Sequence, residues 1–290
     1  MSSFDIGGST TDRGVTIGFD YEYNSVNRLV ENDQQLQNDP RTRNGQSYLI
    51  RADYIHNSKW AFSAFLPWVI QSRATFSEDE SADGLGDLTL ISQYSYLTNK
   101  DAQIKISLGV KLPTGKQFIQ DNRGINLSPD MQSGSGTVDF LGRVAWAKNH
   151  LFMPNLANQT ALSYRYNNTN AHFGDPQKVN GRSFKFGNET ILTSAFSYLS
   201  LIKTWFVIPD FGFQVRYATP NEEEKSEAPN SGGYWYRVPI GVQLQPNETF
   251  SIRIFTEVPV GENLNGLQIT TNYKLGLQLR YRLKDGGVKE

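Results

Sequence analysis

Apolar and polar side chains alternate at every step in the segment from Ile269 to Leu283. One set of positions carries isoleucine, threonine, tyrosine and leucine, whereas the other set includes Lys274, Arg280 and Arg282. A period of two is typical of a β-strand, whose successive side chains point to opposite faces of the sheet. The predicted strand exceeds the length of about five or six residues that is usual in soluble sheets. It suits a tilted crossing of a bilayer, which takes about nine to eleven residues.

The same alternation recurs along the chain and predicts further long strands. In the clearest segments no residue of the apolar face is charged, although charged residues make up 20% of the chain. A charge that faces lipid at the bilayer midplane costs about 2–4 kcal/mol, so this pattern indicates that the apolar face meets lipid. The clearest segments are 15–23, 104–112, 205–217, 234–244 and 250–260, and weaker ones are 46–57, 59–71, 87–98, 136–147, 155–167 and 183–198.

These segments predict an all-β fold, a transmembrane antiparallel up-and-down β-barrel of about 12 strands, as a single domain over residues 1–290. The strands occupy residues 13–283. Bacterial outer-membrane barrels have long extracellular loops and short periplasmic turns. We therefore expect a bacterial outer-membrane location, with both termini and a tail of residues 284–290 on the periplasmic side. Long connections at 25–45, 72–86, 114–135, 168–182 and 218–232, and a moderate one at 261–268, alternate with short ones at 56–59, 98–101, 148–154, 199–203 and 245–248.

Composition excludes several other classes of protein. The net charge is −1 at pH 7, so no basic field points to a nucleic-acid partner. No apolar run approaches the roughly 20 residues of a membrane-spanning helix. Without cysteine the chain has no disulfide and no thiolate metal ligand, and we expect no cofactor and no metal. The opening residues MSSFDIGGSTTD lack the apolar core of a signal peptide, so we expect a mature chain.

The alternative fold is a large soluble β-sandwich or a lipocalin-like barrel, whose aromatic side chains point inward. Aromatic residues of this chain instead lie near the ends of the predicted strands, as in the girdles of membrane barrels. Examples are Trp60, Trp68, Tyr217 and Tyr273. Strand length argues in the same direction, because a soluble sheet would need cover for every one of these long faces.

Three motifs in the middle of the chain carry a resemblance to a known family. They are GLGDLTL at 84–90, GVKLPTGK at 109–116 and QSGSGTVDF at 132–140. In this order, at strand entries and exits, they resemble the outer-membrane channel family of the MetA-pathway of phenol degradation. The resemblance implies a twelve-stranded monomeric barrel that admits small molecules. The chain departs from the usual pattern after Leu283, where KDGGVKE follows and a barrel commonly ends on an aromatic residue.

The glycines of these motifs are expected to be structural. Gly84 and Gly86 give backbone freedom to a loop that re-enters a strand, and Pro113 suits a strand end because it has no N–H to donate. The pair Gly115-Lys116 does not complete a phosphate-binding loop, since Gln117 stands where serine or threonine is required.

Catalysis is not expected. The three histidines, His56, His150 and His172, fall near short turns or in a long loop and do not converge. An outer-membrane phospholipase needs a serine–histidine pair on its lipid face, and no histidine is predicted there.

The inward faces of the strands predict the chemistry of the lumen. Basic residues outnumber acidic ones there, so an open pore would carry a positive potential and favour anions. Equally, the charges could pair across strands and fill the barrel, which in size lies between small filled barrels and wide porins. The candidate pore-lining residues are Arg51, Asp53, Lys105, Lys111, Asp139, Arg143, Arg165, Asp210, Arg216, Trp235, Arg237, Arg253, Phe255, Glu257, Lys274 and Arg280.

Apolar residues such as Ile91, Leu141 and Ile208 also fall on inward positions. They form either a constriction, a path for amphipathic aromatic molecules or a packed plug. Acidic clusters at 79–83 and 222–224 are expected to be solvated, the alternative being divalent cations that bridge to lipopolysaccharide.

We therefore expect a passive outer-membrane channel for the uptake of small molecules, with aromatic or hydrophobic catabolic substrates as one candidate class. The alternative is a structural or adhesive outer-membrane barrel with a closed lumen. The expected partners are outer-membrane lipid, lipopolysaccharide and small-molecule solutes, and the expected oligomeric state is a monomer.

Overall fold

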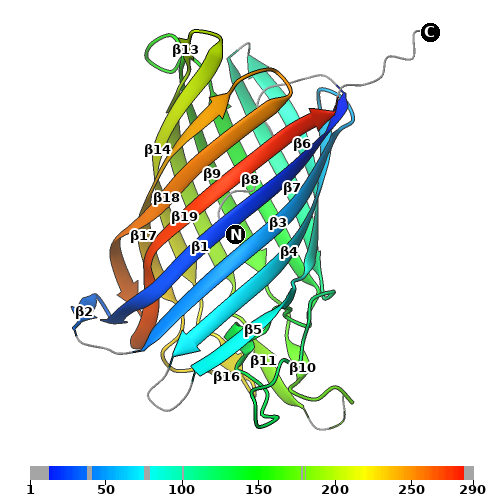
Figure 1. Ribbon diagram of the computed structural model, residues 1–290, viewed down its shortest axis with the longest axis vertical. Coiled ribbons are helices and arrows are strands. Elements are labelled where there is room, and N and C mark those ends of the chain that lie inside the picture. The colour runs from blue at the N-terminus through cyan, green and yellow to red at the C-terminus, as the bar shows by residue number, and fades with distance from the viewer. Residues whose placement is uncertain are drawn as a thin grey trace.

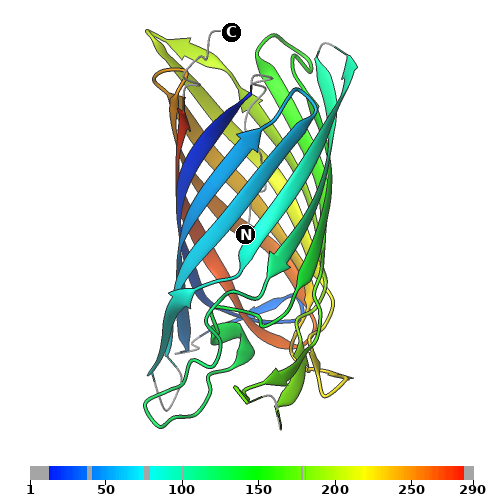
Figure 2. The ribbon, with the colours of Figure 1, turned by 90° about the vertical axis from the view of Figure 1, so that its right-hand side faces the viewer.

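The computed structural model describes residues 13–37, 41–74, 79–99, 101–177, 179 and 181–283. Within them, 12 long antiparallel strands follow one another around a closed barrel, which confirms the predicted fold (Figures 1 and 2). The first and last strands pair with each other, and β12 pairs with β14 to complete the closure. The barrel strands are β1 (Gly14–Glu31), β3 (Thr42–Ile55), β4 (Trp60–Ala74), β6 (Leu88–Asn99), β7 (Ala102–Leu112), β8 (Asp139–Lys148), β9 (Leu156–Tyr166), β12 (Glu189–Tyr198), β14 (Trp205–Ala218), β17 (Gly233–Gln245), β18 (Phe250–Leu264) and β19 (Leu267–Leu283).

Shorter strands lie at the two ends of the barrel. Strand β2 (Gln34–Leu36) pairs with β1, β5 (Asp79–Leu85) pairs with β4, and β13 (Ser200–Ile202) pairs with β14. A separate four-stranded sheet consists of β10 (Asn170–Phe173), β11 (Arg182–Lys185), β15 (Glu222–Glu223) and β16 (Ser226–Glu227). Among the described residues the one helical element is the 3₁₀ turn η1 (Pro129–Met131). No helix in this part of the chain is long and apolar enough to cross a membrane.

The connections divide the barrel into a turn end and a loop end. Val15 at the start of β1 pairs with Leu283 at the end of β19, and both lie at the end that carries the short turns. The strands β5, β10, β11 and β16 lie at the opposite, loop end (Figure 1). The predicted tail at 284–290 lies outside the described residues.

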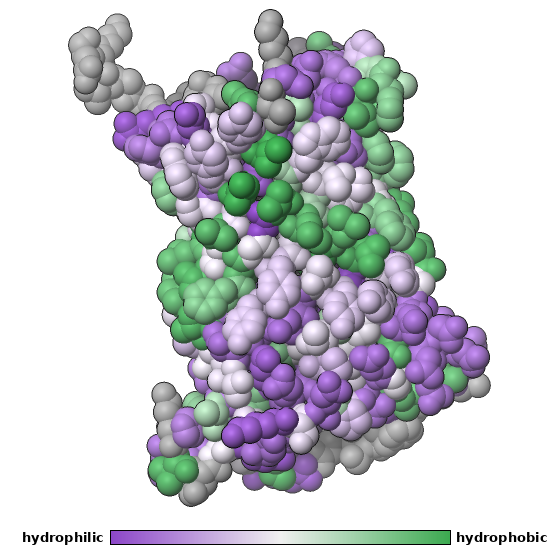
Figure 3. Space-filling model, turned by 180° about the vertical axis from the view of Figure 1, so that it is seen from behind, coloured by the Kyte–Doolittle hydropathy of each residue, from purple (hydrophilic) through white to green (hydrophobic). Residues whose placement is uncertain are grey.

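The two faces of the wall differ in polarity, as the alternation predicts. Outward side chains such as Leu108, Phe211 and Ile50 are 68%, 59% and 59% exposed. Their inward neighbours are buried or half-buried and mostly polar. In Figure 3 hydrophobic side chains spread over the middle of the barrel, and hydrophilic ones gather toward the loop end. The outer surface is therefore suited to lipid.

Two predicted loops are wrong because strands continue through them. Strand β1 runs to Glu31 rather than ending near Tyr23, and β3 begins at Thr42. Register shifts at Ser25, Val26 and Arg28 mark β-bulges that put the later residues out of phase with the alternation. Between residues 261 and 268 the strands likewise continue to Leu264 and resume at Leu267, leaving a tight turn.

The predicted strand at 183–198 is shorter in the barrel. Residues Arg182–Lys185 belong to β11, and β12 begins at Glu189. Between them, the Asn188 N–H donates to the Thr219 hydroxyl over 2.9 Å, and the Gly187 N–H donates to the Asn221 side chain. Side-chain acceptors take these two N–H groups between the strands, while the Asn188 carbonyl still accepts from the Thr219 backbone N–H. The predicted loop at 72–86 is also largely strand, since β4 and β5 form a hairpin across it.

Candidate functional site

The candidate site is the inner face of the barrel. Every predicted pore-lining residue has a buried or half-buried side chain on the face opposite the apolar belt. Whether this face conducts solutes remains a prediction. The side chains are joined by ion pairs that mostly cross from one strand to the next.

One group of pairs lies on the wall formed by β1, β19, β18 and β17. The Lys274 ammonium lies 3.4 Å from Glu257 and 3.7 Å from Glu22. Arg237 reaches the same Glu257 at 3.5 Å. One buried carboxylate therefore holds two cations from neighbouring strands.

Glycines make room for ion pairs along the wall, including one that spans an intervening strand. Arg253 on β18 lies 2.6 Å from Asp210 on β14, across the intervening β17. It passes over Gly241, where a Cβ atom would meet both side chains at under 3 Å. Gly18 makes room in the same way for Arg280, which pairs with Asp20. Each such glycine removes a side chain that would block the pair.

Phe255 fills the wall beside this group. Its ring lies over Gly276, where an added Cβ would meet ring carbons at 2.2 Å. The Arg253 guanidinium carbon lies 4.8 Å from the ring centroid, which is a cation–π contact.

A second group lies on β9, β12, β14 and β17. Glu189 accepts Arg165 at 3.2 Å and also pairs with Arg216. The Arg216 guanidinium stacks over the Trp235 ring at 4.2 Å from its centroid, and the Trp235 indole N–H donates to Thr270. Two guanidiniums share one carboxylate here, which leaves an excess of positive charge.

A third group is the buried pair on β3. The Arg51 Nε lies 2.6 Å from Asp53, and Ser63 of β4 also donates to that carboxylate. Phe65 stacks under the guanidinium at 5.0 Å. By contrast, Lys105 is 6% exposed and makes no ion pair with another described residue. Arg143 lies nearby on β8, opposite Ser107 of β7.

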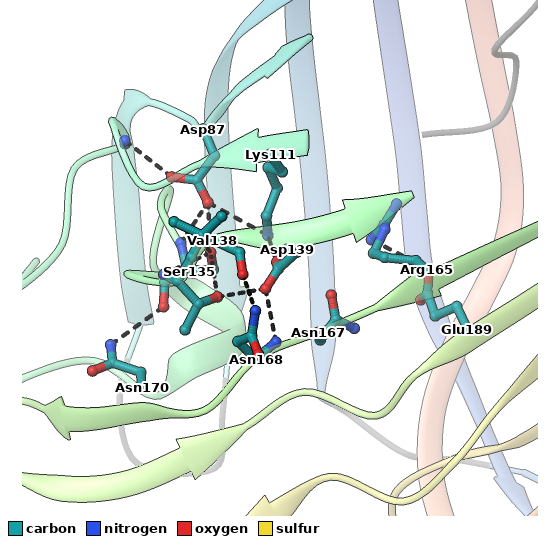
Figure 4. A network of polar contacts seen from close by, with 12 residues as sticks. Asp87, Lys111, Ser135, Val138, Asp139, Arg165, Asn167, Asn168, Asn170 and Glu189 are labelled. Atoms are coloured by element: carbon teal, nitrogen blue, oxygen red, sulfur yellow. Dashed lines mark hydrogen bonds and ion pairs between the residues drawn. The ribbon is translucent and has the colours of Figure 1, made fainter. Parts of the chain in front are cut away.

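The fourth group brings the three sequence motifs together (Figure 4). Asp87 accepts hydrogen bonds from the backbone N–H groups of Gly115 at 3.0 Å and Ser135 at 2.9 Å, and from the Ser135 hydroxyl at 2.6 Å. Lys111 lies 3.5 Å from Asp87 and also pairs with Asp139. The motifs therefore form a structural junction at the loop end, as expected for their glycines.

Asp139 extends this junction to the next strand. It accepts the Thr137 hydroxyl at 2.8 Å and the Asn168 backbone N–H at 2.9 Å. At Gly115, an added Cβ would lie 2.6 Å from the Gly134 backbone, so the two ends of the connection 113–138 pass in direct contact. These contacts need glycine because backbone atoms cannot move aside as a flexible side chain can.

The connection 113–138, here called the mouth loop, is held against the inner wall at the loop end. Arg43 of β3 pairs with Asp130, and Arg73 of β4 lies 3.6 Å from the same carboxylate. Arg73 also donates to Ser128 over 3.0 Å and pairs with Glu80. Burial raises the pKa of Asp130, but the Arg43 charge, the Ser128 hydrogen bond and the Arg73 charge together hold that pKa below its ordinary value.

Sequence reasoning did not single out this clamp. The sequence pattern places Arg43 and Arg73 in loops, although they continue the inward positions of Arg51 and Phe65. Extending the predicted strands back to Thr42 and on to Ala74 puts both arginines on the inward face, because β3 and β4 pair without a register shift.

The acidic clusters of the loops are partly paired. Glu222 lies 2.9 Å from Lys185, Glu223 lies 3.2 Å from Arg182, and Glu224 accepts the Ser183 N–H. These contacts favour stabilisation of the small four-stranded sheet over a cation bridge. Among the described residues no group of three or more acidic or histidine side chains is arranged to hold a metal ion.

The histidines lie where the pattern placed them. His56 follows β3 and His150 follows β8 at the turn end, whereas His172 is in β10 at the loop end. No two of them are placed to act together.

Comparison with known proteins gives a likeness of fold. No family model and no curated protein matches the chain. An outer-membrane channel from Pseudomonas putida F1 is similar over 97% of this chain and 100% of its own, with a TM-score of 0.77 and 15% identity. The transport unit of the autotransporter AIDA-I from Escherichia coli follows at a TM-score of 0.52, 10% identity, and 97% and 94% coverage. The NanC porin has a TM-score of 0.50, 8% identity, and 93% and 100% coverage.

At these identities the likeness shows a shared architecture, that of outer-membrane barrels. The fold implied by the sequence resemblance to an outer-membrane channel family is confirmed, since the first of these structures is such a channel.

Proposed function

We propose that this protein is a passive channel of the bacterial outer membrane that admits small molecules. The observation that carries the proposal is the partial exposure of the inner ion pairs. The side chains of Arg165, Arg216 and Arg253 face the interior of a closed barrel, yet 22%, 25% and 21% of their surface is accessible. Water reaches these charges, whereas a fully packed plug would bury them.

The ion selectivity follows from the balance of these charges. Most inward cations have a carboxylate within ion-pair distance, which cancels much of the positive potential expected from their number. The excess that remains at Glu189, which serves two guanidiniums, and at Lys105 favours anions weakly. The proposed channel is a monomer, with the loop end outside the cell and the turn end in the periplasm.

Swelling of proteoliposomes tests the proposal. Vesicles that contain folded protein should swell in isosmotic solutions of small neutral solutes such as glycerol and arabinose, and protein-free vesicles should not. If folded protein supports no flux of any small solute, the closed structural or adhesive barrel is the better account.

A further inference from the structure

We infer that the lumen wall contains a binding site for small carboxylates that carry a compact apolar body. The inference rests on the proposed channel function and names the class of solute that the channel retains longest. It draws on an open concavity in the inner wall, lined by residues of β6, β7, β8, β9 and β12.

The concavity follows two neighbouring rows of the sheet. In the first row, Ile91 pairs with Gly109, Gly109 with Leu141, Leu141 with Arg165, and Arg165 with Glu189. Neighbours within a row are cross-strand partners whose side chains lie side by side on one face. The row therefore passes from apolar to charged within a single concavity.

Gly109 lets its apolar neighbours close over the backbone. A Cβ atom there would meet Ile91 Cγ1 and the Leu90 carbonyl oxygen at 3.0 Å, and Leu141 Cβ at 3.5 Å. Ile91 and Leu141 therefore pack over Gly109 and form the floor of a shallow apolar depression. These residues were the unexplained apolar side chains among the inward charges, and the register brings them to one place.

Guanidiniums border the other side. Arg165 gives one edge to Glu189, and its buried Nε has no hydrogen-bond acceptor. Glu189 is already shared with Arg216, and Arg143 lines the same concavity in the second row, beside Ser163 and Ile191. Figure 4 shows Arg165 and Glu189 side by side, apart from the Asp87 junction.

A carboxylate fits this arrangement better than a neutral or cationic group. Guanidinium donors bind carboxylates through paired charge-assisted hydrogen bonds, and the partly accessible Arg165 guanidinium borders the depression. The apolar depression accepts a small ring or a branched chain, whose burial adds to the affinity. Acetate can pair with the guanidiniums but has no apolar body to fill the depression. A neutral alcohol of the same shape can fill the depression but cannot pair with the guanidiniums.

The test measures block of the KCl current through wild-type protein in planar bilayers by cyclohexanecarboxylate, acetate and cyclohexanol. We expect cyclohexanecarboxylate to reduce the current at concentrations about tenfold below those of the other two. The variant Arg165→Gln should raise its half-blocking concentration by about tenfold. The variant Ile191→Ser should weaken block by cyclohexanecarboxylate and leave block by acetate unchanged.

Arg253→Gln is the matched control, because it removes the same charge from an inner ion pair outside the concavity. Its half-blocking concentration should stay within about twofold of the wild-type value. Equal block by acetate and cyclohexanecarboxylate, or equal effects of the two arginine variants, overturns the inference and leaves the channel intact. Absence of any KCl current contradicts the proposed function instead. Calorimetric titration of the detergent-solubilised protein with the same solutes then decides whether the site binds cyclohexanecarboxylate.

Discussion

Asp87 joins three motifs that lie far apart in the sequence. Its carboxylate accepts three hydrogen bonds from the two ends of the mouth loop and lies near Lys111. The motifs and the structural role of their glycines were recognisable from sequence. Their common acceptor was not, because the contacts depend on how the two ends of the mouth loop fold back over one strand end. A residue-scale prediction follows for this carboxylate.

The substitution Asp87→Asn should lower the free energy of unfolding by about 1–3 kcal/mol, since the amide keeps one acceptor oxygen and its NH2 group cannot accept from the N–H donor that faced the other. Urea unfolding followed by tryptophan fluorescence measures the change. Asp83→Asn is the control, because Asp83 is exposed in the neighbouring β5. If the two variants are equally stable, the Asp87 carboxylate does not stabilise the junction of the three motifs.

Ion-pair partners were also beyond sequence reasoning at this scale. Alternation correctly placed Arg253 and Asp210 on the inward face, but their pairing requires the register of β14, β17 and β18 together. The alternation of polar and apolar residues shows which face each side chain is on. Its ion-pair partner depends on the register between strands, which bulges and turns determine.

At the scale of elements, the mouth loop has a small buried cluster of its own and is attached to the barrel wall. Met131, Leu127 and Ile119 pack with Ala82 of β5 in a small buried cluster. The Gln132 side chain binds the backbone of Ile119 through both its oxygen and its nitrogen. The Arg43 and Arg73 clamp on Asp130 then ties this unit to β3 and β4. The strands were predictable from their period, but this loop has no period to reveal its packing.

The variant Asp130→Asn should loosen the mouth loop, because it removes the charge that both arginines share. Hydrogen–deuterium exchange at residues 117–132 should become faster than in the wild type, while exchange in β8 and β9 stays unchanged. The same variant at the exposed Asp83 serves as control. Unaltered exchange in the mouth loop of Asp130→Asn would show that the apolar cluster alone holds it.

The pH dependence of the clamp follows from the lowered pKa of Asp130. A carboxylate with a lowered pKa stabilises the folded state above the pKa of an unfolded aspartate, about 4, and this contribution is lost as the pH falls through the lowered value. Exchange at residues 117–132, corrected for its intrinsic rate, should therefore be the same at pH 7 and pH 5. Faster corrected exchange at pH 5 would show that another titrating group controls the loop.

The whole molecule is a wall between two solvents. Its outward residues are apolar because lipid surrounds them, and its inward residues are charged because water and partner charges stabilise them. This division fixed the fold class and strand number in advance, since it repeats in every strand. The concavity beside Leu141 and Arg165 was not foreseen, because it arises only when five strands align in one row.

The central claim is that a water-filled path runs through the barrel, and the absence of native cysteine permits a direct test. Single cysteines replace Thr193, which faces inward, and its neighbour Leu192, which is 46% exposed on the outer face. A charged, water-soluble methanethiosulfonate reagent is then added during recording of channel current. The account predicts a stepwise change in current for Thr193→Cys and none for Leu192→Cys. No modification of Thr193→Cys in a folded barrel, or equal effects at both positions, would contradict it.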